Sequence, residues 1–124
     1  MKTLSIEGTQ QTPSVKFDSA KGFLEIKGSS ITENAIDFYK PLMNYLEIYI
    51  TKPKAETIVN IQFEYLNNGS SKCILAMFKK LEAINKLGNK VLVNWFYKDE
   101  DMLEAGEDYQ LIINLPFKMI PIAK

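Results

Sequence analysis

The residues most able to do chemistry lie in one short segment, Tyr65-Leu66-Asn67-Asn68-Gly69-Ser70-Ser71-Lys72. A strand-like run precedes this segment and a helical pattern follows it, so we expect it at the carboxyl edge of a sheet. Ligands and partners bind at that edge in open α/β sheets. A helix that begins here offers unpaired N–H groups and a partial positive charge, which stabilise a phosphate.

The hydroxyls of this segment have two interpretations. Because the apolar helix face begins at Ile74, we expect the N-cap at Ser70 or Ser71. One of these hydroxyls serves only as a helix cap, or it also takes a phosphoryl group. Ser71 is favoured over Ser70 as the acceptor of a phosphoryl group, because the ammonium of Lys72 follows it. The spacing of a nucleotide-binding P-loop is absent, and so is the Gly-x-Ser-x-Gly turn of a hydrolase.

A second feature is the acidic segment 99–108, in which six of ten residues are Asp or Glu. The rest of the chain carries nine acidic residues against fifteen lysines, and this polarity can orient a partner. A Ca²⁺ loop needs Gly at its sixth position, where a loop starting at Asp99 has Glu104. The segment therefore predicts a protein contact and no metal site, with a solvated helix face as the alternative. The predicted contact residues are Asp99, Glu100, Asp101 and Glu104.

The composition narrows the class of protein further. The 124 residues include fifteen lysines and fifteen acidic residues, but no Arg and no His. The absence of His argues against a metalloenzyme and a Ser-His hydrolase, and zero net charge argues against nucleic-acid binding. The lone Cys73 excludes an internal disulfide and is expected to be an inert thiol. No catalytic residue, metal or cofactor is expected, although a small carboxylate-dependent enzyme remains an alternative.

The location of the protein is also expected from the sequence. There is no run of about 18 apolar residues and no apolar signal core at the N-terminus, so we expect a cytoplasmic protein without a membrane partner.

The elements that position these segments follow from periodicity and turn residues. Strands are predicted at 4–6, 14–17, 23–27, 57–66, 90–97 and 110–115, with 116–124 as a tail. Helices are predicted from an N-cap at Thr32 through Tyr49, over 72–87 and over 99–108, with Pro41 kinking or restarting the first and Gly88 closing the second. Trp95 is expected in the core. The order β-β-β-α-β-α-β-α-β predicts one α/β domain over residues 1–124, with a mostly parallel mixed sheet and an N-terminal antiparallel hairpin.

Together these segments resemble the SiaC family of bacterial regulatory phosphoproteins over nearly the whole chain. The motifs that carry the resemblance are 12–18 (TPSVKFD), 28–34 (GSSITEN), 38–41 (FYKP), 64–67 (EYLN), 70–72 (SSK), 95–97 (WFY) and 100–109 (EDMLEAGEDY). The resemblance implies a STAS-like fold related to anti-sigma-factor antagonists, and a non-enzymatic partner-switching function. It also implies a cognate kinase, a PP2C-type phosphatase and an output protein, such as a diguanylate cyclase that controls biofilm formation.

The resemblance also places the switch. The family pattern is Asn-Thr-Ser-Ser with the Thr as phosphoacceptor, and here that position is Asn68. Because Asn cannot be phosphorylated, either Ser70 or Ser71 is the acceptor, or this chain is a constitutive adaptor without the switch. The resemblance and the junction together predict a partner surface that includes Asn67, Gly69 and Lys72.

Overall fold

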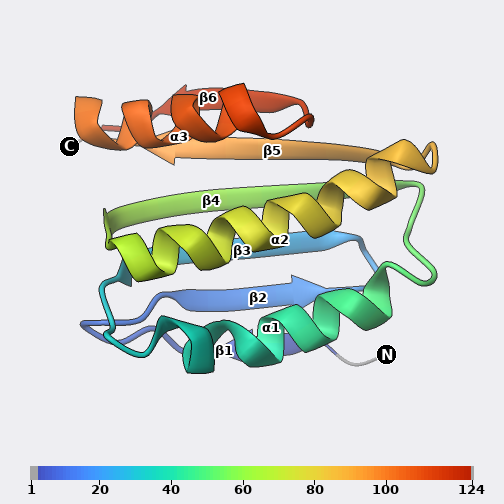
Figure 1. Cartoon of the computed structure of the whole chain (residues 1–124), viewed down its shortest axis with the longest axis horizontal. Coiled ribbons are helices and arrows are strands. Elements are labelled where there is room, and N and C mark those ends of the chain that lie inside the picture. The colour runs from blue at the N-terminus through green and yellow to red at the C-terminus, as the bar shows by residue number, and fades with distance from the viewer. Residues whose placement is uncertain (1–2, 124) are drawn as a thin grey trace.

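A computed structural model describes residues 3–123 as one mixed sheet with three helices (Figure 1). The sheet has six strands in the order β1-β2-β3-β4-β5-β6. The elements in chain order are β1 (Leu4–Ile6), β2 (Ser14–Asp18), β3 (Phe23–Ser30), α1 (Ala35–Tyr49), β4 (Glu56–Leu66), α2 (Asn68–Lys86), β5 (Lys90–Tyr97), α3 (Glu100–Ile112) and β6 (Phe117–Pro121). The predicted order of strands and helices is confirmed.

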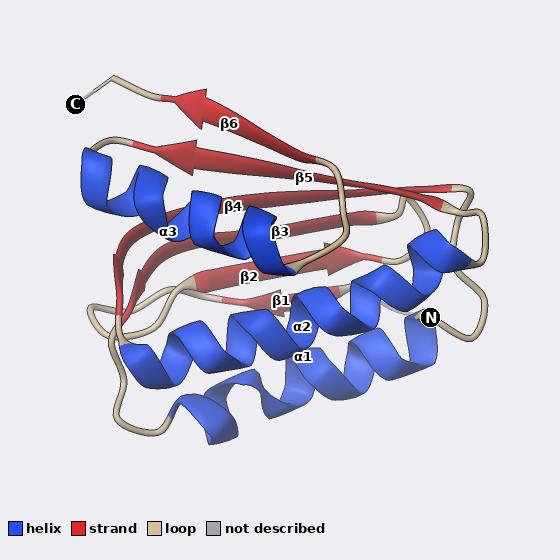
Figure 2. Ribbon diagram, turned by 45° about the horizontal axis from the view of Figure 1, so that its top comes forward, coloured by secondary structure: helices blue, strands red, loops and turns tan. Residues whose placement is uncertain are grey.

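The sheet combines an antiparallel and a parallel half. β1, β2 and β3 pair antiparallel, whereas β3 through β6 pair parallel. Each parallel pair is joined by one helix, and every crossover steps to the next strand in the same direction. Right-handed crossovers therefore place all three helices on one face of the sheet, as Figure 2 shows. None of the helices within residues 3–123 is long and apolar enough to cross a bilayer.

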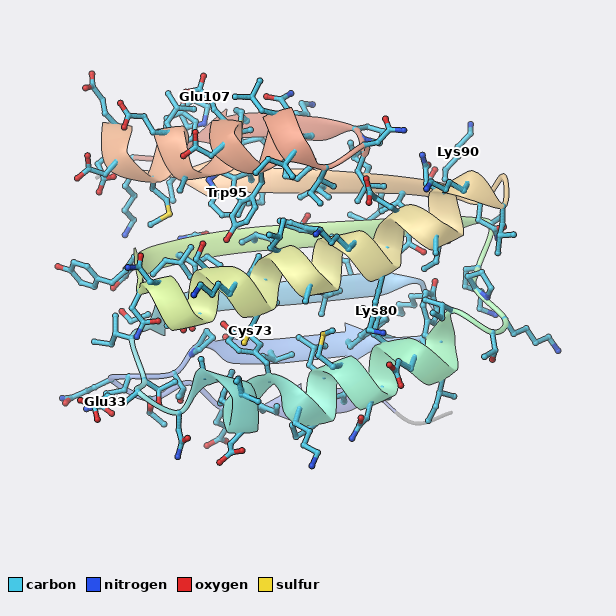
Figure 3. All side chains as sticks on the ribbon, viewed as in Figure 1. Glu33, Cys73, Lys80, Lys90, Trp95 and Glu107 are labelled. Carbon is cyan, nitrogen blue, oxygen red and sulfur yellow. The ribbon has the colours of Figure 1, made fainter. Side chains whose placement is uncertain are left out.

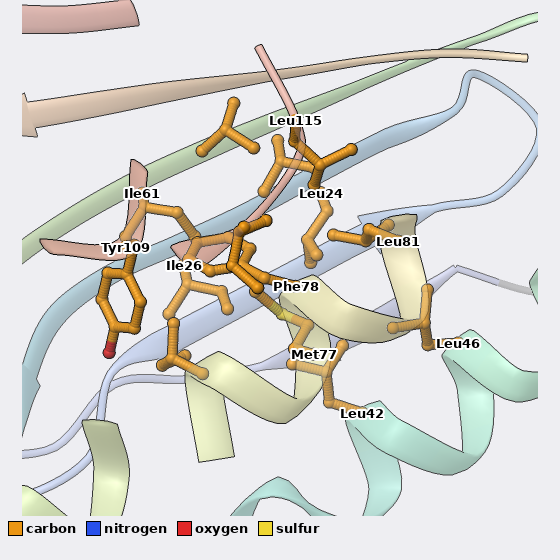
Figure 4. Close-up of a cluster of buried hydrophobic side chains, with 14 of the residues drawn as sticks. Leu24, Ile26, Leu42, Leu46, Ile61, Met77, Phe78, Leu81, Tyr109 and Leu115 are labelled. Atoms are coloured by element: carbon orange, nitrogen blue, oxygen red, sulfur yellow. The ribbon is translucent and has the colours of Figure 1, made fainter. Parts of the chain in front are cut away.

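The core lies between the helices and the covered face of the sheet (Figure 4). β4 alternates buried and half-buried residues over Thr57–Phe63, which is the pattern of a strand with one packed face. Trp95 on β5 is fully buried, which confirms its predicted place in the core. The buried side chains of β3, β4 and β5 pack against α1 and α2, so the same core fixes both helices on the sheet.

α1 confirms the predicted helix but not all of its details. Its buried residues recur with spacings of four and three at 35, 39, 42, 46 and 49, whereas Ile36 and Ile48 lie off this stripe and are exposed. The predicted N-cap at Thr32 is wrong. The cap position is Asn34, and the Thr32 hydroxyl accepts from the Asn34 N–H in a turn just before it. The helix does not restart at Pro41, which is exposed in its second turn.

The C-terminal prediction is wrong in its boundaries. A strand was expected at 110–115, but α3 continues to Ile112 and β6 occupies 117–121 within the expected tail. The helix continues because the Tyr109 ring packs in the core. Its centroid lies 5.1 Å from that of Phe78 and 5.5 Å from that of Trp95. The strand-like Leu111 is therefore exposed on the helix surface. Pro121 is tolerated because β6 is an edge strand.

Candidate functional site

The N-terminal turn of α2 is fixed by Asn67. β4 ends at Leu66, and the Asn67 side chain accepts a hydrogen bond from the Ser70 N–H at 2.8 Å as the N-cap. Its Nδ2 donates to the Thr32 carbonyl at 3.0 Å, and its backbone N–H donates to the Ser30 carbonyl at 3.0 Å. The predicted cap at Ser70 or Ser71 is therefore wrong, because an Asn upstream caps the helix equally well and starts it a turn earlier.

Ser70 lies inside the protein. Its side chain is fully buried, and its Oγ accepts a hydrogen bond of 2.8 Å from Ser30 on β3. Ser30 Oγ also lies 2.7 Å from Tyr39 Oη on α1. Because the Ser30 proton goes to Ser70, Tyr39 donates to Ser30. Burial raises the pKa of Tyr39 well above its ordinary value, and the hydrogen bond with Ser30 only partly opposes this. Three hydroxyls therefore join α2, β3 and α1 in a buried network.

Ser71 joins α2 to α3. Its half-buried Oγ lies 2.7 Å from Tyr109 Oη, and Tyr109 Oη donates to the Ser71 carbonyl at 2.9 Å. The Tyr109 proton is thus committed to the carbonyl, so the Ser71 hydroxyl donates to Tyr109. Burial raises the pKa of Tyr109 to about 12, with the hydrogen bond to Ser71 opposing it. Within residues 3–123, neither hydroxyl is hydrogen-bonded to a carboxylate or an amine that would activate it as a nucleophile.

Asn68 and Gly69 occupy the exposed part of the same turn. Asn68 lines a hollow of about 380 Å³ together with Glu64, Tyr65, Asp99 and Asp101, among others. The hollow combines carboxylates with a Tyr65 ring that is 65% exposed. The structure therefore brings Asn68 and part of the acidic segment together.

Two further hollows flank the first turns of α2. One of about 460 Å³ lies against α1 and is lined by Ile36, Gly69, Lys72 and Cys73, among others. The other, of about 220 Å³, lies against α3 and is lined by Ser71, Lys72 and Ile112, among others. We call the surface around Tyr65, Asn68, Gly69, Lys72 and these hollows the α2 face. A further hollow of about 480 Å³ lies at the opposite end of the sheet, and none of the predicted site residues lines it.

The acidic segment is partly explained by helix capping. Asp99 is the N-cap of α3 and accepts a hydrogen bond from the Met102 N–H at 2.9 Å. Glu100 and Asp101 lie in the first turn, where the helix dipole favours negative charge. Glu104 is exposed one turn on, and Glu107 is exposed further along the same helix (Figure 3). Among residues 3–123 there is no group of three or more His, Cys, Asp or Glu side chains arranged to hold a metal ion.

Cys73 lies on α2 between the N-terminal turn and the core (Figure 3). It is half-buried, and burial raises the pKa of its thiol. A raised pKa keeps the sulfur protonated at neutral pH and makes it a poor nucleophile. This agrees with the inert thiol expected from the absence of His and Arg.

The predicted site residues include neither four exposed apolar side chains nor the hydroxyl network. Ile36, Tyr65 and Ile112 line the hollows of the α2 face and are between 63% and 78% exposed, and Leu111, next to Ile112 on α3, is 86% exposed. Tyr65 had a signal in the sequence, because it lies near the carboxyl end of a strand, at the edge where partners bind in open α/β sheets. The links from Ser30 to Ser70 and from Ser71 to Tyr109 span 40 and 38 residues, and no local pattern announces such contacts.

Residues 3–123 form a two-layer α/β fold in which the start of α2 is capped by Asn67 and is exposed at Asn68 and Gly69. Residues 6–122 match the SiaC family of regulatory phosphoproteins, and the chain belongs to this family. An uncharacterised protein of Pseudomonas aeruginosa (strain UCBPP-PA14) is 27% identical over 119 residues, which are 94% of each chain.

Solved structures of SiaC from Pseudomonas aeruginosa share the fold. The crystal structure of apo-SiaC superposes with a TM-score of 0.90 at 26% identity, covering 97% of this chain and 99% of that one. Another SiaC structure gives a TM-score of 0.91 at 25% identity, covering 98% and 100%. A third structure holds the diguanylate cyclase SiaD in complex with its activator SiaC; it matches with a TM-score of 0.90 at 26% identity, covering 96% and 99%.

Proposed function

We propose that this chain is a cytoplasmic, non-enzymatic regulator of one domain that binds a signalling output protein, with a diguanylate cyclase as the first candidate. The observation that carries this proposal is the similarity, over nearly the whole chain, to a SiaC that is in complex with the diguanylate cyclase it activates. The α2 face adds support, because it combines exposed apolar side chains with hollows on both sides of one helix. Aromatic and aliphatic anchors of this kind carry most of the energy of protein interfaces.

The α2 face is the proposed contact surface. It contains the predicted residues Asn68, Gly69 and Lys72, and the hollow beside Asn68 contains Asp99 and Asp101. Asn67 contributes indirectly, because both ends of its side-chain amide are committed to the backbone. Glu100 and Glu104 extend the negative charge along α3, where they would steer a basic partner.

Control by phosphorylation is the finer part of the proposal, with a kinase and a PP2C-type phosphatase as further partners. Ser71 is the better acceptor of the two hydroxyls, because Ser70 is fully buried and Ser71 is only half-buried. A phosphate on Ser71 would break its hydrogen bond with Tyr109 and add negative charge between α2 and α3. Added charge at this point would change how the α2 face binds its partner.

A constitutive adaptor is the second candidate, and one observation favours it. The exposed position in the turn is Asn68, which has no hydroxyl, whereas both serines are engaged in hydrogen bonds with other elements. Modification of Ser71 would therefore cost a tertiary contact that modification at position 68 would not. The two candidates differ in whether the protein carries a phosphoryl group.

The experiment has a modification arm and a binding arm. Incubation with the host's cognate kinase, followed by peptide mass spectrometry, should place phosphate on Ser71 if the switch operates. No phosphate at all would favour the adaptor, and phosphate outside Ser70 and Ser71 would sink the assignment. In calorimetric titrations against the host's diguanylate cyclase, Ser71→Glu should bind differently from the wild type. Equal binding would remove the support for Ser71 as a switch.

A further inference from the structure

Asn68 and Gly69 form the only Asn-Gly pair in the chain, and the fold does not explain the glycine. Gly69 does not have a positive φ, and a Cβ added to it would meet Ala35 Cβ at 3.7 Å and Asn67 Oδ1 at 3.9 Å, which are ordinary contacts. Glycine in a helix is less stable than alanine because it loses more backbone freedom on folding. An alanine would therefore fit and would favour the helix.

Neither of the two groups that can react within this pair has a hydrogen-bond partner among residues 3–123. The exposed Asn68 side chain has no hydrogen-bond partner among residues 3–123, whereas the amide of neighbouring Asn67 has two. The Gly69 N–H lies in the first turn of α2, where backbone N–H groups have no intrahelical acceptor. The amide carbon of Asn68 and the nitrogen that can attack it are therefore neighbours without competing contacts.

We propose that Asn68 is a site of spontaneous deamidation. The Gly69 nitrogen attacks Asn68 Cγ, losing its proton; the Cγ–Nδ2 bond breaks, and Nδ2 leaves as ammonia. The resulting cyclic imide takes up one water molecule. Cleavage at Cγ restores the normal backbone as aspartate, and cleavage at the main-chain carbonyl gives isoaspartate. Either product carries one carboxyl group, which ionises at neutral pH.

Two features of the structure control the step. The absence of a Cβ at Gly69 lets the nitrogen approach Asn68 Cγ without steric hindrance. The helical conformation opposes ring closure, so the first turn must fray before the reaction, and helix ends open at low cost. Asn67 before the pair and Ser70 after it are both hydrogen-bonded to other parts of the fold, so the opening is confined to the exposed pair itself.

The consequence for binding rests on the proposed function. Deamidation adds a negative charge at the first position of α2, in a hollow already lined by Glu64, Asp99 and Asp101. Because the reaction needs no enzyme and does not reverse, it would act as a one-way change in the charge of the α2 face.

The test follows the modification directly. The purified full chain is incubated in mildly alkaline buffer at body temperature, and its peptides are analysed by mass spectrometry and by enzymatic methylation of isoaspartate. We expect the mass spectra to show conversion of the amide to the acid at Asn68 and not at Asn67. We expect the methylation assay to detect isoaspartate at Asn68 as well. Gly69→Ala and Asn68→Gln should both lose the signal while keeping the fold. An unmodified Asn68, or equal modification of Gly69→Ala, would overturn the proposal.

A separate arm measures Asn68→Asp and Asn68→Gln against the host's diguanylate cyclase. Asp should change the affinity more than Gln, because both variants alter a side chain of the α2 face but only Asp adds charge. Equal affinities would overturn the regulatory consequence. If neither variant nor the wild type binds, the proposed function fails, and the mass spectrometry still decides the modification.

Discussion

Gly106 is the position at which the docking of α3 can be tested most sharply. α3 approaches β5 so closely that a Cβ on Gly106 would lie 2.5 Å from Trp95 Cδ1 and 2.6 Å from Trp95 Nε1. The indole is fully buried and donates to the Met102 carbonyl at 2.9 Å, so it has no room to retreat. Gly106→Ala should therefore push α3 away from the sheet.

The expected cost follows from three contributions. Overpacking a core contact costs about 1–3 kcal/mol, and leaving the indole N–H unpaired costs a similar amount. The higher helix propensity of alanine returns about 1 kcal/mol. The net loss in free energy of unfolding is then about 3 kcal/mol, which shifts a urea midpoint by roughly 1.5 M for a typical small domain.

Gly69→Ala is the matched control, because it makes the same change in a helix where a Cβ has space. It should leave the free energy of unfolding unchanged or raise it by up to about 1 kcal/mol. Urea unfolding followed by Trp95 fluorescence measures both variants. If Gly106→Ala is as stable as the wild type, or if both variants move in the same direction, the proposed close packing of α3 on Trp95 is wrong.

Three further predictions concern the residues around the α2 face. Tyr109→Phe should lower stability by about 1 kcal/mol, since it removes two hydrogen bonds to Ser71. Burial raises the pKa of Tyr109 from 10.0 to about 12, so the unfolded chain loses this proton at a lower pH than the folded chain does. Between these two pKa values, the free energy of unfolding should fall by roughly 1.4 kcal/mol per pH unit through this group, and less steeply in Tyr109→Phe. Asn67→Ala should cost about 1–2 kcal/mol in urea unfolding through loss of the cap, whereas Asn68→Ala should stay within about 0.5 kcal/mol; equal costs would refute the assigned cap. Partner binding should weaken as salt is added, because exposed charges are screened over about 8 Å at physiological ionic strength. The double change Asp101→Asn with Glu104→Gln should reduce this salt dependence in calorimetry, and Glu56→Gln at the other end of the sheet should not.

The order of the elements could be predicted because each carries a local signal. β4 alternates in hydrophobicity, the apolar residues of α2 repeat every three or four residues, and Gly88 adopts the positive φ of 95° that ends that helix. The boundary between α3 and β6 could not be predicted, because Leu111 and Ile112 favour a strand locally. Tertiary packing of Tyr109 on Trp95 and Phe78 holds this segment in the helix instead.

The strand-to-helix junction that holds the candidate site was predictable, but its internal contacts were not. The strand-to-helix junction is readable from the sequence around Asn67, and the structure places the α2 face there. The cap was assigned to the wrong residue because Asn67, Ser70 and Ser71 are all good caps, and only the path of the chain after β4 decides between them. The burial of Ser70 depends on Ser30 and Tyr39, which reach it from other elements.

Activation can be measured as the rate of product formation by the host's diguanylate cyclase, with and without this protein. The wild type should raise this rate in a saturable way. Lys72→Glu on the α2 face should lose most of the effect, whereas Lys52→Glu at the opposite end of the sheet should keep it. An unchanged rate at saturating protein, or equal activation by both variants, would contradict the assignment of the α2 face as the surface that binds and activates the cyclase.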